Sequence, residues 1–217
     1  SQTELMKEAK QLEYFQKNSH TVIIPKPYLE LCNDNILVMD WINGCGLTDS
    51  KAKYTIEEKK NFGSQFAHFL KECCENGRVH MDLHPGNVII TNNDKLAIVD
   101  FGIVAHMEKQ KCKMLVKMFS SFYEDNFEGF AENFRSLYAP SMTAILYNKM
   151  KELFEFIKTE EKQPLYVYIK QVYDLCESEN QYLSNEFGDL EFAFSTAKGT
   201  FMELWNMGDD EFWTLMS

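Results

Sequence analysis

The chain has 217 residues, of which 45% are hydrophobic, and its formal net charge at pH 7 is −11. This length suits one domain, or one domain with a helical appendage, and the apolar content excludes a disordered chain. The negative charge makes nucleic acid and anionic membranes poor default partners, although a local basic face is compatible with it. We find no apolar run long enough to predict a transmembrane helix and no secretory signal after Ser1.

The first 44 residues are predicted to contain one helix and two strands. Apolar residues recur at helical spacing between residues 3 and 18. Pro25 and Pro27 then require an extended backbone. Residues 28–32 and 36–40 are expected to be two strands joined by an Asn-Asp-Asn turn.

A second helix is predicted to begin after Thr55. Thr55 and Glu58 have the spacing of a capping box, in which each side chain bonds the other residue's backbone N–H. The helix carries an apolar stripe and is expected to end near Gly77, because glycine adopts the left-handed backbone that closes many helices. The stripe consists of Phe62, Phe66, Phe69, Leu70 and Cys73.

The most informative stretch follows, as His-Met-Asp-Leu-His-Pro-Gly-Asn at residues 80–87 and Asp-Phe-Gly at residues 100–102. Phosphoryl transfer needs divalent cations beside the phosphates and a carboxylate that orients the acceptor. Asn87 and Asp100 supply the hard oxygen ligands that Mg²⁺ prefers, and Asp82 remains to accept or steer the proton of the acceptor. Either triplet alone is a weak signal, but the joint pattern at this spacing strongly favours a kinase-like site.

A hairpin is predicted between the two halves of this motif. Two short β-branched runs, at residues 88–90 and 96–99, flank a polar turn at residues 91–94. Such a hairpin brings Asn87 and Asp100 back together. We expect His80 to be structural, bonding backbone near the Asp-Phe-Gly turn, and Gly86 to supply an unusual backbone angle.

The remaining 115 residues after Gly102 are mostly helical in pattern. Their aromatic stripes are interpreted as core rather than as a cofactor site. The run Asp209-Asp210-Glu211 is expected to be a solvated face. The six cysteines contain no CxxC pair, which favours free thiols in a reducing compartment. The expected helices span residues 107–123, 127–138, 142–157, 165–176 and 190–207.

Several segments together resemble the UbiB/AarF group of atypical kinases. These segments are Lys7–Phe15, Ile24–Pro27, Leu37–Gly44 with Leu47–Asp49, Val79–Ile90 and Val99–Ala105. The resemblance covers about residues 6–104, and the helical tail is compatible with it.

The resemblance implies an α+β, protein-kinase-like fold that binds ATP and Mg²⁺. It implies that Asp82 is the catalytic carboxylate and that Asn87 and Asp100 bind Mg²⁺. It places Met39, Asp40 and Trp41 at the hinge that contacts adenine through backbone groups. The other positions carried over are structural: the ion-pairing Glu8, together with His80, Gly86, Phe101 and Gly102.

The same resemblance implies a role in coenzyme Q or other prenyl-lipid metabolism, with ATPase activity or phosphorylation of a lipid or small molecule. Nucleotide is then the expected ligand, and proteins of prenyl-lipid biosynthesis and peripheral membrane contact are expected partners. The expected location is intracellular, in mitochondria, plastids or at bacterial membranes.

The family's Lys-x-Gly-Gln segment, its Ala-rich nucleotide loop and its phosphate-binding lysine are expected before Glu8, where only seven residues stand. Lys7 and Lys10 share a helix with Glu8, so neither faces it from a strand. We therefore interpret residues 1–44 as part of a small lobe and residues 45–217 as a large lobe. Because positioning of the phosphates contributes several kcal/mol to catalysis, the expectation is very low phosphotransfer by this chain alone.

Two alternatives remain open. Phosphotransferases of the aminoglycoside or choline type share the His-x-Asp-Leu-His-Pro-Gly-Asn and Asp-Phe-Gly motifs, and a tail pocket lined with carboxylates would favour them because cationic substrates need such groups. The other alternative is an inactive pseudokinase or a lipid-binding scaffold. Replacement of Asp82 or Asp100 by asparagine would leave the biological role of a scaffold intact.

Overall fold

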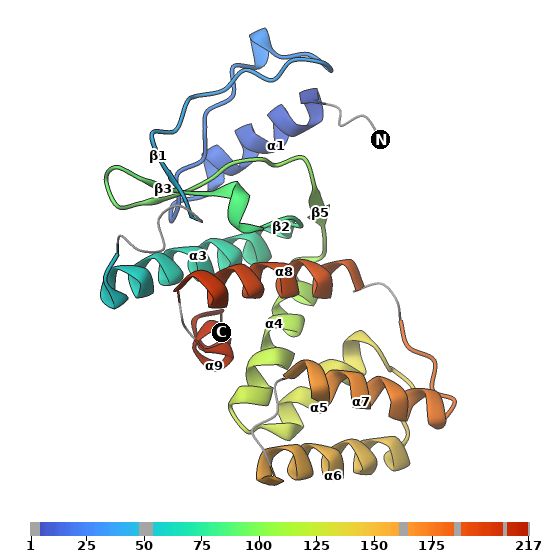
Figure 1. The fold of residues 1–217 in the computed structure, drawn as a ribbon. Helices are drawn as coiled ribbons and strands as arrows, with labels where there is room; N and C mark the ends of the chain where they lie inside the picture. The colour runs from blue at the N-terminus through green and yellow to red at the C-terminus, as the bar shows by residue number, and fades with distance from the viewer. Residues whose placement is uncertain (1–4, 48–53, 161–164, 185–187, 206–207, 217) are drawn as a thin grey trace.

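A computed structural model describes residues 5–47, 54–160, 165–184, 188–205 and 208–216. Figure 1 shows α1 and the strands at one end of the molecule, α5, α6 and α7 at the other, and α8 lying across the middle beside α3. The α-helices are α1 (Leu5–Asn18), α3 (Ile56–Asn76), α4 (Lys109–Tyr123), α5 (Phe127–Leu137), α6 (Ala144–Glu160), α7 (Leu165–Ser178), α8 (Gly188–Trp205) and α9 (Asp209–Met216). The strands are β1 (Gly44–Gly46), β2 (Arg78–His80), β3 (Val88–Thr91), β4 (Leu96–Ile98) and β5 (Val104–His106), with 3₁₀ turns η1 (Leu29–Leu31) and η2 (Pro85–Asn87).

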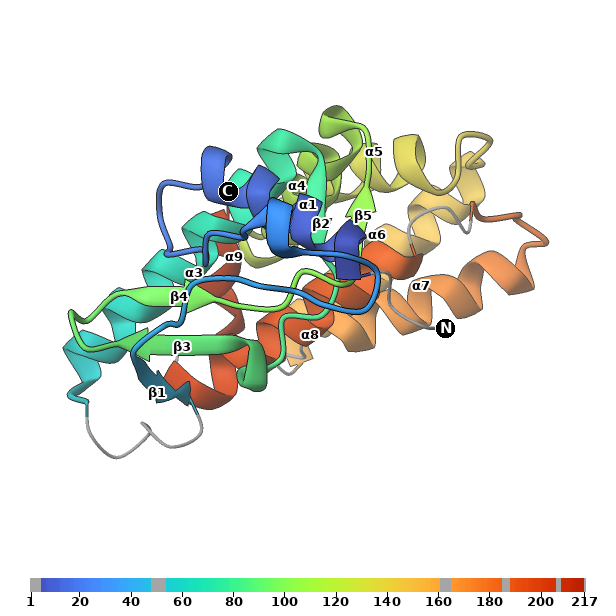
Figure 2. The same cartoon turned by 90° about the horizontal axis from the view of Figure 1, so that it is seen from above.

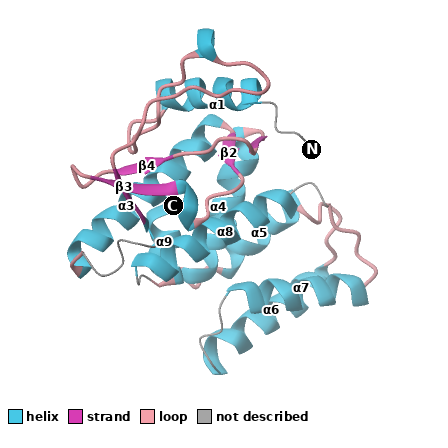
Figure 3. Ribbon diagram, turned by 45° about the horizontal axis from the view of Figure 1, so that its top comes forward, coloured by secondary structure: helices cyan, strands magenta, loops and turns pink. Residues whose placement is uncertain are grey.

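The predicted hairpin is confirmed. β3 and β4 pair antiparallel, with Val88 opposite Ile98, and β1 adds to the outer edge of β3. Asp94 adopts a positive φ of 55° in the turn, a backbone that aspartate tolerates better than most residues. In Figure 3 the strands gather near α1 and α3, and helices joined by loops make up most of the rest of the molecule.

The prediction of regular strands at residues 28–32 and 36–40 is wrong. The two segments do run antiparallel, with a backbone hydrogen bond from Tyr28 N to Val38 O and isolated bridges on either side. Leu29–Leu31 forms a 3₁₀ turn that interrupts the ladder. Among the described residues these segments have no continuous third strand beside them, so the local β-propensity is not reinforced by a sheet.

The helix that supports the motif is built as the sequence predicts. Thr55 and Glu58 form the capping box at the start of α3, and Gly77 ends the helix with a left-handed φ of 66°. The whole predicted apolar stripe of this helix is buried. The helix thus presents one apolar face, along which α4, α8 and α9 lie.

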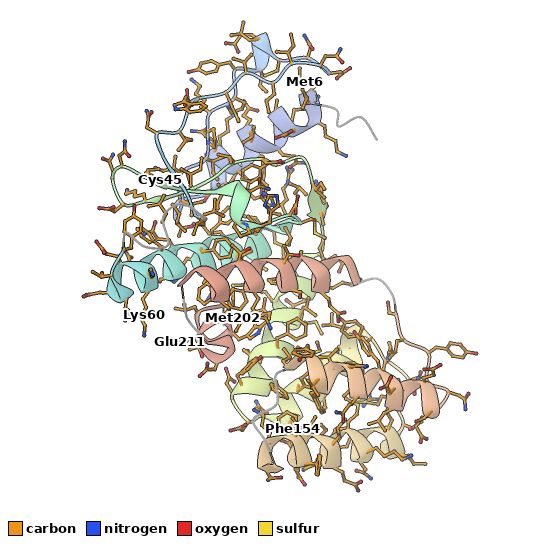
Figure 4. The ribbon with its side chains drawn as sticks, in the orientation of Figure 1. Met6, Cys45, Lys60, Phe154, Met202 and Glu211 are labelled. Atoms are coloured by element: carbon orange, nitrogen blue, oxygen red, sulfur yellow. The ribbon has the colours of Figure 1, made fainter. Side chains whose placement is uncertain are left out.

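The tail contains the expected helices with small shifts of their ends, and the predicted end at residues 206–207 lies outside the described residues. The aromatic stripe of α5 is buried, as predicted, as are Phe194 and Phe201 of α8. Residues 209–211 open α9, and the predicted solvated face is confirmed for Asp210, which is exposed, and for Glu211, whose side chain is 41% exposed. That short helix buries Phe212, Trp213 and Met216, and Glu211 pairs with Lys60 of α3 at 3.3 Å (Figure 4).

All six cysteines are free, as predicted. No helix in the described part of the chain has the length and apolar character needed to cross a bilayer.

Candidate functional site

The two halves of the motif leave the same strand pair. β2 and β5 pair antiparallel, with His80 opposite Val104, and Met81 N donates to Ile103 O at 3.0 Å. Residues 81–87 therefore leave the end of β2 at the point where residues 100–103 approach β5. On the other side, Val99 N donates to Asn87 O at 3.0 Å. The hairpin and the β2–β5 pair thus bring the segments of Asp82, Asn87 and Asp100 to one place, as the spacing predicts.

Asn87 is oriented by the backbone of Asp82. Its Nδ2 donates to Asp82 O at 2.9 Å, and only 6% of the residue is exposed. This bond uses the donor of the amide and leaves Oδ1 as the acceptor, which is the atom that a hard cation requires. The Asp82 side chain is 44% exposed, so its carboxylate is accessible to a molecule that docks on this loop.

Asp100 sits in a sharp turn. Its φ is +68°, in the left-handed region that aspartate adopts more readily than most side chains. Its Oδ1 accepts a hydrogen bond from Gly102 N at 3.0 Å. Because one carboxylate oxygen caps this turn, the carboxylate is held in a fixed orientation and its other oxygen is available to a ligand.

His80 joins the two segments. Its Nδ1 accepts from Asp82 N at 3.2 Å, so its Nε2 carries the hydrogen and donates to Asp100 O at 2.6 Å. The ring also lies 4.8 Å, centroid to centroid, from that of Phe101, which in turn packs on Phe15 of α1. Burial lowers the pKa of His80 to about 4, outweighing the opposing hydrogen bond to the Asp100 carbonyl and the nearby carboxylates. A neutral imidazole therefore locks the loop of Asp82 to the turn of Asp100.

The depressed pKa of His80 predicts a specific loss of stability in acid. The His80 imidazole takes up a proton near its ordinary pKa of 6.5 in the unfolded chain, but only near pH 4 in the folded chain. The stability that neutral His80 contributes to the folded state is therefore fully present above about pH 6.5, and it falls as the pH drops from there towards 4. We expect the free energy of unfolding, from urea titrations, to lose about 2 kcal/mol from this residue between pH 7.5 and 5.

The variant His80→Gln keeps a neutral amide donor and should remove this part of the pH dependence while lowering stability at pH 7.5. His68→Gln, on α3, is the control and should retain the dependence. Glu8 acts in the opposite sense, because its pKa is raised and the stability it contributes grows as the pH falls. This effect is the same in the wild type, His80→Gln and His68→Gln, so it cancels in the comparison. Equal pH dependence in wild type and His80→Gln would show that His80 does not behave as described.

Glu8 lies inside the site rather than at the surface. Its Oε1 accepts from Phe101 N at 3.3 Å, and the residue is 8% exposed. Burial, and next the negative charge of Asp100, raise the pKa of this carboxyl. Within the described residues no lysine or arginine forms an ion pair with it, so the pairing expected for Glu8 stays a prediction. A cation placed between Glu8 and Asp100 would relieve the repulsion that these two carboxylates exert on each other.

The residues predicted to form the hinge lie on the segment that leads into β1. Asp40 N donates to Lys26 O at 3.0 Å, and Asp40 Oδ1 accepts from Tyr28 OH at 2.7 Å. Trp41 is 84% exposed. Since β1 pairs with β3, and β3 begins directly after Asn87, the hinge segment is connected to the metal-type ligands through one sheet. The Asp40 N–H is already used within this segment, so an adenine contact there would fall to other backbone groups.

Gly86 corrects one expectation. Its φ lies outside the left-handed region, so it does not supply the unusual backbone angle that we expected. The glycine instead permits a close approach: a Cβ here would lie 2.8 Å from His84 Cε1, so the His84 ring would have to shift. The His84 ring folds over this position because its Nδ1 accepts from Gly86 N at 3.0 Å. That bond leaves His84 Nε2 3.7 Å from Asp82 Oδ2, beyond hydrogen-bond distance.

The donor set fits magnesium better than a transition metal. Across the described residues, no group of three or more histidine, cysteine, aspartate or glutamate side chains is placed to hold a metal ion. One carboxylate from Asp100 and one amide oxygen from Asn87 match the sparse protein ligation of Mg²⁺, whose remaining ligands are commonly water and phosphate oxygens. Thr200 of α8, whose hydroxyl bonds the loop at Leu83 O, was missed by the sequence analysis, since nothing local marks it.

Comparisons with known proteins agree with the motif. Residues 2–134 match the ABC1 atypical kinase-like domain. The chloroplastic protein Activity of BC1 complex kinase 1 of Arabidopsis thaliana is 32% identical over 141 residues, which is 60% of this chain and 20% of that protein. A protein of Photorhabdus laumondii named as the probable protein kinase UbiB is 27% identical over 160 residues, which is 69% of this chain and 28% of that protein.

Among solved structures, Rv3197 of Mycobacterium tuberculosis, solved as a complex with erythromycin, superposes with a TM-score of 0.62 at 16% identity. The match covers 98% of this chain and 56% of that one, and at this identity it shows the fold alone. The chain matches only 20% to 28% of the length of these two curated relatives. The fold is the expected α+β kinase-like fold, and the chain belongs to the ABC1 atypical kinase-like family.

Proposed function

We propose that this chain carries the catalytic and metal-binding half of a Mg–ATP site in an atypical kinase or ATPase of the UbiB type. In this proposal Asp82 accepts or steers the proton of the acceptor, and Asn87 Oδ1 and the free oxygen of Asp100 hold Mg²⁺. The ion, when bound, offsets negative charge on the phosphates of the nucleotide. The observation that supports the proposal is the hydrogen bond from Asn87 Nδ2 to Asp82 O, which uses the donor of the amide and leaves its oxygen as an acceptor for a cation.

The chain's own residues do the positioning. His80, neutral at physiological pH, holds the backbone of Asp82 and of Asp100 at once, so the two acids cannot drift apart independently. Phe101 anchors the turn by packing against Phe15 and His80, and Gly102 N caps the Asp100 carboxylate. Such preorganisation is the main contribution a protein makes to phosphoryl transfer.

The described tail pockets do not favour a phosphotransferase of the aminoglycoside or choline type. A cavity of about 280 Å³ between α4, α7, α8 and α9 is lined by Lys170 and Lys198, and its single carboxylate, Glu191, already accepts from the hydroxyls of Tyr138 and Tyr173. A second cavity of about 410 Å³, between α3 and α4, is lined by three lysines and two glutamates. Neither has the excess of carboxylates that a cationic substrate would require.

The prenyl-lipid link, the partners and the compartment stay proposals. The names of relatives, which include chloroplastic and bacterial proteins, support a plastid or bacterial location, whereas the prenyl-lipid link and the partners rest on the family resemblance alone. The test of the core proposal is ATP turnover by the protein expressed from its complete reading frame. We expect turnover that requires both Mg²⁺ and Asp82; turnover that persisted without Asp82 would contradict the proposed function.

A further inference from the structure

A buried hydroxyl from the far end of the chain is bonded to the loop of Asp82. Thr200 lies in α8 and is 3% exposed. Its Oγ1 donates to Leu83 O at 2.8 Å, across 117 residues of sequence. Leu83 follows Asp82 directly, and its carbonyl lies in the Leu83–His84 peptide unit, so this bond holds the backbone on the far side of Leu83 from the proposed catalytic residue.

The other hydrogen bonds of this loop serve a different purpose. Asp82 N bonds His80, Asp82 O accepts from Asn87, and Asn87 N donates to His84 O. These bonds join the loop to itself and, through His80, to the turn of Asp100. Met81 N and Asn87 O join the ends of the loop to the neighbouring strands in the same way. Among the side-chain hydrogen bonds of the described residues, that of the Thr200 hydroxyl ties the loop to a helix.

The helix that carries Thr200 is packed into the core. Ala197 and Phe201, on the same side of α8, are fully buried, and the ring of Phe201 packs at 4.9 Å on that of Phe212 in α9. α8 also contacts α3 and β2, and Figure 2 shows it running beneath β3. A donor on this helix therefore has a defined position relative to the core.

We propose that Thr200 is a positioning residue for Asp82, acting through the carbonyl of Leu83; this inference rests on the proposed function of Asp82. Without the hydroxyl, the Leu83 carbonyl is left buried without this donor, and the peptide unit turns to find another partner. That turn shifts Leu83 and, through the Asp82–Leu83 peptide, displaces the Asp82 carboxylate. A displacement of about 1 Å at a catalytic group can reduce a rate by about 100-fold.

The test compares three variants with the wild type, all expressed from the complete reading frame. Thr200→Val removes the hydroxyl at nearly constant shape, and Thr200→Ser restores it. Thr159→Val is the matched control, because the Thr159 hydroxyl also bonds a backbone carbonyl, that of Glu155, but within the exposed face of α6. We expect kcat for ATP turnover to fall at least about tenfold in Thr200→Val while KM for Mg–ATP stays within about twofold, with recovery in Thr200→Ser and no change in Thr159→Val.

Measurements are made below the unfolding transition of every variant, followed by circular dichroism. If Thr200→Val does not fold, Thr200→Cys replaces it, since its thiol is a weaker donor of similar size, and an intermediate kcat is expected. Unchanged kcat in the folded variant would overturn the inference. Thr200→Val could instead lower stability while kcat and KM both stay unaltered, or it could lower kcat and raise KM together. Either result would show a merely structural role for Thr200 and would overturn the inference too.

The failure of this inference differs from a failure of the proposed function. If Asp82→Asn abolishes turnover and Thr200→Val does not change it, the positioning role alone is wrong. If Asp82→Asn leaves turnover intact, the proposed function is wrong, and the role of Thr200 falls with it.

Discussion

Asp82→Asn is expected to lower the ATP turnover of the protein expressed from its complete reading frame by about 100- to 10,000-fold, the range that a positioned general base contributes. Asparagine has nearly the same shape but cannot take a proton. The loop should keep its form, because the bonds that hold it at this residue use backbone atoms, Asp82 N to His80 and Asp82 O to Asn87. The affinity for Mg–nucleotide should therefore change by less than about threefold.

The control for this substitution is Asp174→Asn, at an exposed position on α7, which removes the same charge far from the motif. It should leave turnover unchanged. If the biological role of the protein, assayed by complementation, survives Asp82→Asn in full, the scaffold interpretation replaces the enzymatic one.

Asp100→Asn is expected to weaken Mg²⁺-dependent nucleotide binding by at least about tenfold, since loss even of groups that only support a metal ligand costs about 10- to 100-fold. Asparagine tolerates the left-handed φ of +68° at this position, and its Oδ1 can still accept from Gly102 N. The substitution thus removes one charged oxygen ligand without forcing the turn open.

The measurement is titration of a fluorescent ATP analogue in Mg²⁺ and again in EDTA. Only the Mg²⁺ value should change in Asp100→Asn. Asp94→Asn is matched to it, because Asp94 is also an aspartate at positive φ, 55°, but stands in the turn between β3 and β4. Equal Mg²⁺-dependent affinities for the two variants would exclude Asp100 as a metal ligand.

Local chemistry explains which parts of the fold could be predicted from the sequence. The capping box of Thr55, the left-handed Gly77 and the turn between β3 and β4 all depend on residues within a few positions of each other. The convergence of Asn87 and Asp100 was predictable for the same reason, since a tight hairpin leaves its two ends adjacent.

Features set by distant contacts were not predictable. Residues 28–32 contain a 3₁₀ turn instead of the predicted strand, because among the described residues no third strand extends the short pairing with residues 36–40 into a sheet. α9 is short, and its apolar residues are stabilised as a helix by burial against α3, α4 and α8. The Thr200 bond joins residues 117 positions apart, and no spacing rule in the sequence identifies such a pair.

The buried carboxyl of Glu8 shows how the site combines both kinds of information. Its place on an amphipathic helix was readable from the sequence. Its contact with Phe101 N, 93 residues away, depends on how α1 packs on the Asp-Phe-Gly turn through Phe15. This contact brings the negative charges of Glu8 and Asp100 near each other, which favours a cation in the site.

The most direct measurement is the position of Mn²⁺, as a substitute for Mg²⁺, in crystals grown with a non-hydrolysable ATP analogue. Anomalous scattering should place the ion between Asn87 Oδ1 and the Asp100 carboxylate, about 2 Å from each, as hard octahedral cations require. An ion bound elsewhere, or a nucleotide bound with its phosphates away from these two side chains, would contradict the account.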